Sequence, residues 1–329
     1  MKRFFLLVAV FAAGALLAGC TVFRVNLLPS AQNRLKEVTL QGKASSKVAV
    51  ISISGTISGR SRKGLLRDRA SMVQEVVSRL KLAQKDKQVK AVVLKIDTPG
   101  GTASASDILY HEIMAYKRRS GAKVVAAMMG LATSGGYYVS LAADAIYAHP
   151  TTVTGSIGVI FLQPKAIGLM KKIGVDVDVS KSGPNKDMAS PFRRSTAEER
   201  RILQALTHSL ADQFLHLVAI RRHLLAETLA QVATARIYLA ADARKLGLID
   251  AIGYLPDAID KAKELAGLDP ACKVVAYQRR TAPDGTVYSD ALNRYAGSSS
   301  PGPRLSLWSL LPVKQPGFYY LWLPGLSAE

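Results

Sequence analysis

Residues 89–101 read VKAVVLKIDTPGG, and residues 123–136 read KVVAAMMGLATSGG. Each stretch starts as a short apolar run and ends in a glycine turn, and residues 104–119 between them have helical spacing. An earlier apolar run, residues 48–53, is followed by helical spacing over residues 65–84. Short apolar runs that alternate with helices are typical of parallel strands in βαβ units. The sequence therefore predicts an α/β fold with a parallel sheet.

The two glycine turns also suggest chemistry. Ser134 stands where the second apolar run meets a helical stretch, so backbone N–H groups and the helix dipole could stabilise an oxyanion there. Gly100 and Gly101 allow the backbone of the first turn to approach Ser134 closely and to bring further N–H groups beside it. A nucleophile with its oxyanion hole and a pair of ordinary tight turns both fit this pattern. The Gly-x-Ser-x-Gly elbow of α/β hydrolases is only half matched, because Ala132 replaces its first glycine.

A serine nucleophile needs a base, and lysine can supply one if burial lowers its pKa by several units from about 10.4. The chain has many lysines, and spacing alone does not select one. No phosphate-binding glycine loop follows any predicted strand. Overlapping capping boxes at residues 195–199 predict a helix to about residue 225, and its histidines lack metal-ligand spacing. We expect no cofactor and no metal.

The chain has 329 residues and a formal net charge of +20, with 44 Lys+Arg against 24 Asp+Glu. This composition excludes a disordered chain, a collagen-like repeat and a small disulfide-stapled domain. The charge predicts an anionic partner, either nucleic acid or a membrane surface. The basic start MKR precedes an apolar run, residues 4–17, that is too short to span a bilayer comfortably. We therefore expect residues 1–19 to be an export signal. We also expect the positive charge of the protein to face membrane lipid and not nucleic acid.

Residues 17–20, LAGC, resemble the lipobox of bacterial lipoproteins, in which the signal is cut before a cysteine that carries lipid. The resemblance implies lipid on Cys20 and a chain anchored to a bacterial membrane in the cell envelope, with its catalytic part outside the cytoplasm. Each buried lipid CH₂ contributes about 0.8 kcal/mol to membrane binding, so several acyl chains on one cysteine would anchor the protein stably. An ordinary signal peptide or a signal anchor, either with an incidental cysteine, is the alternative. Residues 20–47 are polar and are predicted to form a tether.

Several motifs along the chain resemble the signal peptide peptidase A (SppA) family of serine proteases. They are DTPGG at 97–101, ATSGGYY at 132–138, TGSIGV at 154–159, KSGPNKD at 181–187, SPFR at 190–193 and LGLID at 246–250. The resemblance covers residues 48–268, the predicted catalytic domain. Residues 269–329 are predicted to be a C-terminal extension with an aromatic tail. One departure is Ala235, where many relatives have glycine, and this puts the local turn in doubt.

The resemblance implies a ClpP/crotonase-like fold of repeated ββα units and a Ser/Lys dyad. Carried over by motif, Ser134 is the nucleophile and Lys186, kept neutral by burial, is the general base. The backbone N–H groups of Gly101 and Gly135 form the oxyanion hole. Ser156 orients the lysine amine, with a plain turn or cap role as its alternative.

The implied activity is that of a membrane-associated serine endopeptidase that degrades cleaved signal peptides and other hydrophobic peptides, with small or apolar residues in its specificity pocket. The resemblance also implies a homo-oligomer in which the serine and lysine of one site come from neighbouring subunits. Two alternatives stay open. One is a related membrane protease that cleaves a specific membrane-protein partner, and the other is a non-proteolytic exported lipoprotein.

Overall fold

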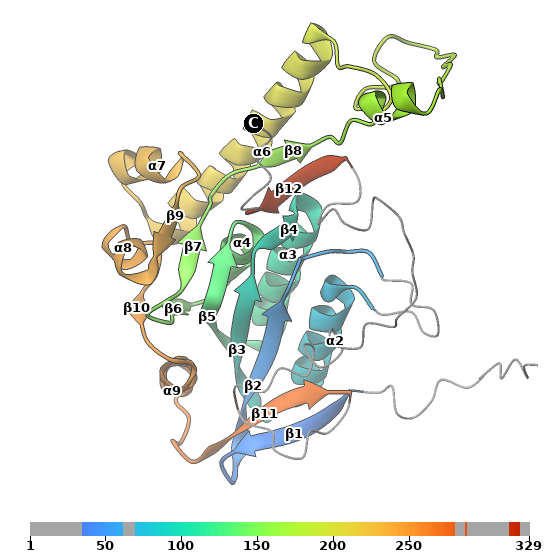
Figure 1. The fold of residues 1–329 in the computed structure, drawn as a ribbon. Coiled ribbons are helices and arrows are strands. Elements are labelled where there is room, and N and C mark those ends of the chain that lie inside the picture. The colour runs from blue at the N-terminus through green and yellow to red at the C-terminus, as the bar shows by residue number, and fades with distance from the viewer. Residues whose placement is uncertain (1–34, 62–69, 280–286, 288–315, 323–329) are drawn as a thin grey trace, which may run out of the picture. The chain divides into compact units, whose positions relative to one another are not determined.

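The computed structural model describes residues 35–61, 70–279, 287 and 316–322, all of which belong to one unit, Leu35–Glu329. A nine-stranded mixed sheet forms its centre (Figure 1). The main path runs β1-β11-β2-β3-β5-β6-β10, and β7 continues from the end of β5 to β9. These strands are β1 (Lys36–Gln41), β2 (Ala44–Ser54), β3 (Val89–Thr98), β5 (Lys123–Thr133), β6 (Ala145–Ala148), β7 (Val153–Gly155), β9 (Ile237–Leu239), β10 (Ala251–Ile252) and β11 (Cys272–Gln278).

Helices cover both faces of this sheet, and the alternation of β3 shows why. Val92, Leu94 and Ile96 belong to the large core that lies under α2 (Met72–Lys85) and α3 (Ala103–Ser120). Ala91 and Val93 point to the other face and pack in the core under α9 (Leu255–Leu265). Because successive side chains of a strand alternate between faces, a strand buried on both sides is apolar throughout.

The remaining elements lie around this central sheet. A second, three-stranded sheet runs β4-β12-β8, from β4 (Gly100–Thr102), β12 (Gly317–Leu321) and β8 (Ile160–Leu162). The helices there are α4 (Gly135–Ser140), α5 (Ile167–Lys172), α6 (Ala197–Arg222), α7 (Ala226–Val232) and α8 (Ala240–Lys245). Helix α6 begins at the predicted capping box, in which Thr196 and Glu199 bond each other's backbone N–H. No helix of the described residues is apolar over a length that would carry it through a bilayer.

Segments on both sides of the predicted catalytic domain, residues 48–268, contribute strands to the central sheet. Part of the predicted tether forms β1 and the start of β2, and both lie in the central sheet. The extension predicted after residue 268 contributes β11, which is inserted between β1 and β2. Cys272, the first residue of β11, is buried and has a free thiol. Nothing in the local pattern of these segments records that they pair with strands over 200 residues away. The predicted signal, Cys20 and most of the tether lie outside the described residues.

Candidate active site

Ser134 lies at the junction of β5 and α4, in an unusual backbone conformation. Its φ is 54° and its ψ is −113°, a region that costs a non-glycine residue about 1–3 kcal/mol. The residue is 1% exposed, and its Oγ has no hydrogen-bond partner among the described residues. Strain and an unpartnered buried hydroxyl are both costs to stability, and such costs gather at functional sites. The structure therefore gives the predicted nucleophile the features of a reactive position.

The two predicted glycine turns meet beside Ser134. Their strands are neighbours, with Thr98 opposite Ala132. Gly100 has a φ of +98°, and a Cβ there would lie 2.7 Å from the backbone nitrogen of Gly135. A Cβ on Gly101 would lie 2.5 Å from the carbonyl carbon of Ile57 and closer still to its oxygen. Only glycine allows such approaches, which bring the backbones of both predicted oxyanion-hole residues to one place.

Ser156 follows the strand next to that of Ser134. Strand β7 pairs in parallel with β5, with Gly155 opposite Thr133, and the Ser134 N–H donates to the Gly155 carbonyl at 2.8 Å. Ser156 itself has a φ of 51°, and its N–H donates to the Arg236 carbonyl at 2.9 Å. The two serines thus directly follow the paired ends of neighbouring strands.

Lys186 lies elsewhere, and within a single chain its side chain is exposed. The residue is exposed and stands in a turn, where its N–H donates to the Gly183 carbonyl at 3.1 Å. That turn is tied to Glu199 at the start of α6, whereas Phe214 of the same helix packs against Tyr138 of α4, with ring centroids 4.9 Å apart. Fifteen residues of α-helix span about 22 Å. The loop between α5 and α6 accordingly lies away from α4 in Figure 1.

Comparisons with known proteins show the family to which this chain belongs. Residues 116–269 match the model of peptidase family S49, and residues 67–154 match that of Clp protease. A putative signal peptide peptidase SppA from Enterococcus faecium is 34% identical over 262 residues, 79% of this chain and 76% of that protein. The chain belongs to peptidase family S49. A putative protease from Synechocystis is 37% identical over 224 residues, 68% of this chain and 76% of its own length.

The S49 family match identifies the chain as an SppA-like serine protease homologue and confirms the ClpP/crotonase-like α/β fold. The chloroplastic serine protease SPPA of Arabidopsis thaliana is 32% identical over 225 residues, 68% of this chain and 33% of that protein. Among solved structures, a ClpP1 mutant from Listeria monocytogenes matches 64% of this chain and 94% of its own, with 17% identity and a TM-score of 0.42.

A segment that sequence reasoning did not place lies beside the S49 motifs. Strand β12 pairs antiparallel with β4 on one side, Tyr320 opposite Gly101, and with β8 on the other, Tyr319 opposite Ile160. The Tyr320 carbonyl lies against Gly100 and Gly135, since a Cβ on either glycine would meet its oxygen. The aromatic residues of the tail were visible in the sequence, but their pairing partners were not.

The ring of Tyr320 occupies an aromatic pocket. It stacks on Tyr138 with centroids 5.1 Å apart and contacts Phe214 at 4.9 Å. Its hydroxyl donates to the Leu210 carbonyl at 3.3 Å, and only 3% of the residue is exposed. Burial raises the pKa of Tyr320 to about 12, so the hydroxyl stays protonated and able to donate. The Tyr320 side chain is thus surrounded by aromatic rings.

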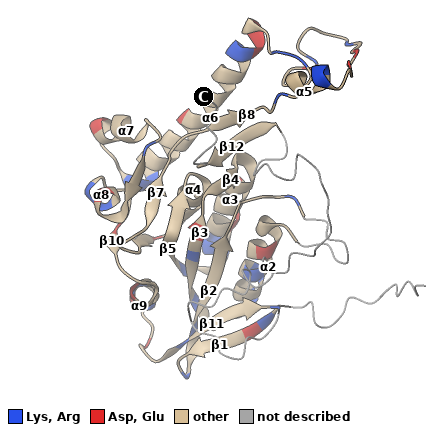
Figure 2. Ribbon diagram, in the orientation of Figure 1, with Lys and Arg blue, Asp and Glu red and all other residues tan. Residues whose placement is uncertain are grey.

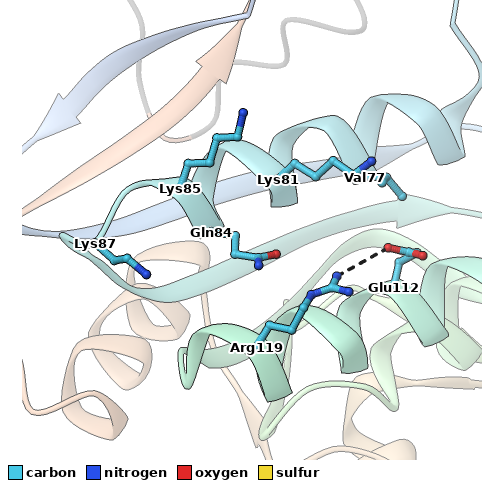
Figure 3. A pocket seen from close by; sticks show the side chains of 7 residues that line it. All are labelled: Val77, Lys81, Gln84, Lys85, Lys87, Glu112 and Arg119. Atoms are coloured by element: carbon cyan, nitrogen blue, oxygen red, sulfur yellow. Dashed lines mark ion pairs between the residues drawn. The ribbon is translucent and has the colours of Figure 1, made fainter.

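A separate surface hollow lies between α2 and α3 (Figure 3). It contains none of the S49 motif residues. Its lining is mostly basic and polar, and Arg119 pairs with Glu112 at 4.0 Å. The residues that line it are Val77, Lys81, Gln84, Lys85, Lys87, Glu112 and Arg119.

Proposed function

We propose that this chain is a membrane-associated serine endopeptidase that uses Ser134 and Lys186 to cleave hydrophobic peptides, remnant signal peptides above all. One observation carries the proposal. An extended segment, β12, fills the space between β4 and β8 with a carbonyl against Gly100 and Gly135, next to the strained, buried Ser134. Strands are about 4.8 Å apart, so the gap admits one extended peptide, and a substrate in the place of β12 would be bound by strand addition.

The chemistry follows from this arrangement. Ser134 Oγ attacks the peptide carbonyl carbon while its proton passes to the neutral Lys186 amine. The negative charge that develops on the carbonyl oxygen is stabilised by the N–H groups of Gly101 and Gly135. The protonated lysine then gives its proton to the leaving amine, and the acyl-enzyme forms as the C–N bond breaks. Water, deprotonated by the same lysine, hydrolyses the ester. Ser156 orients the amine from the neighbouring strand.

Lys186 reaches Ser134 in this proposal from a second copy of the chain. The segment that carries it is exposed and unusually apolar, which supports an interface between copies. Among the described residues, the exposed large apolar side chains of this segment are Leu169, Ile173, Val175, Val177, Val179 and Phe192, each between 44% and 60% exposed. Burial of such a surface would also remove the lysine from water, as a neutral amine requires.

The expected location supports the same class of substrate. The export signal and lipid on Cys20 would hold the enzyme at a membrane in the cell envelope, where hydrophobic peptides remain after protein export. The positive charge fits anionic lipid. The pocket that Tyr320 fills is lined by aromatic rings, so a large apolar or aromatic side chain fits there, which extends the expectation of small or apolar residues.

A serine-directed acylating probe on the full-length protein tests the proposal. Labelling is expected at Ser134, and it should be lost in Ser134→Ala and in Lys186→Ala. An unchanged label in Lys186→Ala would remove lysine as the base, and an unlabelled wild-type protein would favour the non-proteolytic lipoprotein. Cleavage of isolated signal peptides, compared with that of membrane-protein tails, separates a degradative enzyme from one with a specific partner.

A further inference from the structure

One arginine connects the turn that carries Lys186 to the start of α6. Arg193 donates from Nε to Asp187 Oδ2 and from Nη2 to Asp187 Oδ1, both at 2.7 Å, and it also bonds the Asp187 carbonyl at 3.3 Å. The other side of the same guanidinium donates from Nη1 to Glu199 Oε2 at 2.9 Å, and Nη2 bonds Oε1. Arg193 thus joins the residue next to Lys186 to the first turn of α6.

The far end of this link is fixed. Glu199 has a side chain that is 1% exposed, and it also accepts the Thr196 N–H at 2.9 Å as part of the α6 capping box. Further along α6, Phe214 and Val218 are fully buried, and Arg221 donates to the Leu141 carbonyl at 2.8 Å. Because the C-terminal half of α6 is docked and the helix is continuous, a turn attached to Glu199 has a defined place relative to the body of its own chain.

We propose that Arg193 is the positioning residue for Lys186: it fixes the turn from which the lysine is presented to Ser134. This inference rests on the proposed Ser/Lys mechanism. A guanidinium can bond two carboxylates at once because its five donors form a planar fork, whereas an ammonium is a single point charge. The geometry around Arg193 uses this property, with Asp187 on one edge and Glu199 on the other.

The same network keeps a carboxylate away from the lysine amine. Asp187 directly follows Lys186, and a free carboxylate there would pair with the ammonium form and oppose its action as a base. Hydrogen bonds from Arg193 and from Lys181, at 2.8 Å, hold the pKa of Asp187 well below its usual range. The charged groups of this network are Lys165, Lys181, Asp187, Arg193 and Glu199. Figure 2 shows both signs of charge at the start of α6.

The test measures kcat, KM and the thermal midpoint of full-length Arg193→Ala and Arg193→Lys, with Arg201→Ala as the matched control. Arg201 is on the same helix, but it is 77% exposed and pairs only with Glu198 among the described residues. We expect both Arg193 variants to lose about 10- to 100-fold in kcat, because a displaced catalytic group costs this much, with little change in KM. Arg201→Ala should keep the wild-type kcat. A wild-type kcat in Arg193→Ala, or a loss confined to KM, would overturn the inference.

Mixed assemblies provide the second measurement and separate positioning from general damage. If Arg193 acts on the lysine side of the site, Arg193→Ala subunits should recover activity when mixed with Ser134→Ala subunits and should not recover it with Lys186→Ala subunits. The reverse pattern would contradict the inference. Full activity in Lys186→Ala alone would instead refute the proposed function. If Ser134→Ala and Lys186→Ala fail to complement each other, the dyad lies within one chain. The comparison of kcat in Arg193→Ala and Arg201→Ala then decides whether Arg193 positions the lysine.

Discussion

Substitution of Gly101 by alanine tests whether the two glycine turns form the oxyanion hole. A Cβ at this position would meet the Ile57 backbone at its carbonyl carbon, 2.5 Å away, and at its Cα, 2.7 Å away, whereas real Cβ contacts stay beyond 3.0 Å. Both groups are backbone, held by the Ile57 N–H bond to the Gly100 carbonyl at 2.8 Å, so no side chain can rotate away. Clearing the Ile57 carbonyl therefore moves the Gly101 N–H by about 1 Å, a misplacement that can cost about 10²-fold in rate.

We expect Gly101→Ala to lose about 10² to 10³ in kcat/KM, which corresponds to roughly 2.7–4 kcal/mol and matches the loss of one oxyanion donor. The rate of probe acylation at Ser134 and the hydrolysis of a fluorogenic peptide both measure it. Gly59→Ala is the matched control, because a Cβ there meets nothing within 4 Å and the backbone is not in the left-handed region. Wild-type acylation in Gly101→Ala would refute the assignment of this turn.

Gly135 offers a finer version of the same test. A Cβ there would collide with the hydroxyl of Ser106, which is a side chain, and would reach the Gly100 Cα only at 3.2 Å. Gly135→Ala should therefore lose activity, and adding Ser106→Ala should restore part of it by removing the first collision. No recovery in the double variant would mean that the backbone contacts alone decide the effect.

Three further predictions concern other parts of the structure. Ala235 has a φ of 56°, so Ala235→Gly should raise the free energy of unfolding by about 1 kcal/mol in urea titrations, and a decrease would contradict the strain. Tyr320→Ala should destabilise the docking of β12 by about 3 kcal/mol and speed the labelling of Ser134, because β12 and the probe would occupy the same place. Phe318→Ala, at a less buried residue, should have a smaller effect. Slower labelling in Tyr320→Ala would contradict this competition between β12 and the probe. The Arg193 hydrogen bond lowers the pKa of Glu199 to about 2, so its contribution to stability is present above the unfolded value near 4.3 and is lost as the pH falls toward 2. Hydrogen-exchange protection of residues 183–199 should fall over this range. Glu199→Gln should show a smaller fall, because only Asp187, whose pKa Arg193 also lowers, then titrates in this network.

Much of the fold follows from short-range patterns. The apolar runs, the glycine turns and the capping box at Thr196 predict β2, β3, β5, α3 and α6 close to their observed places, because each pattern reflects a burial period or a cap within a few residues. Ser134 was identifiable in the same way, as a serine between an apolar run and a glycine-led helix. The S49 motifs added Lys186 and Ser156, whose local surroundings carry no comparable signal.

Only the tertiary structure decided which distant segments lie together. Strand β11 enters the central sheet between β1 and β2, and β12 fills the edge beside Gly101 and Ser134, although both follow the segment that resembles the family. Lys186 is held at the opposite end of α6 from the α4 contact. The physical reason is that strand pairing depends on which edges are open once the chain has folded, and no window of sequence contains both partners. The candidate site residues could thus be predicted from the sequence, and their distances from one another could not.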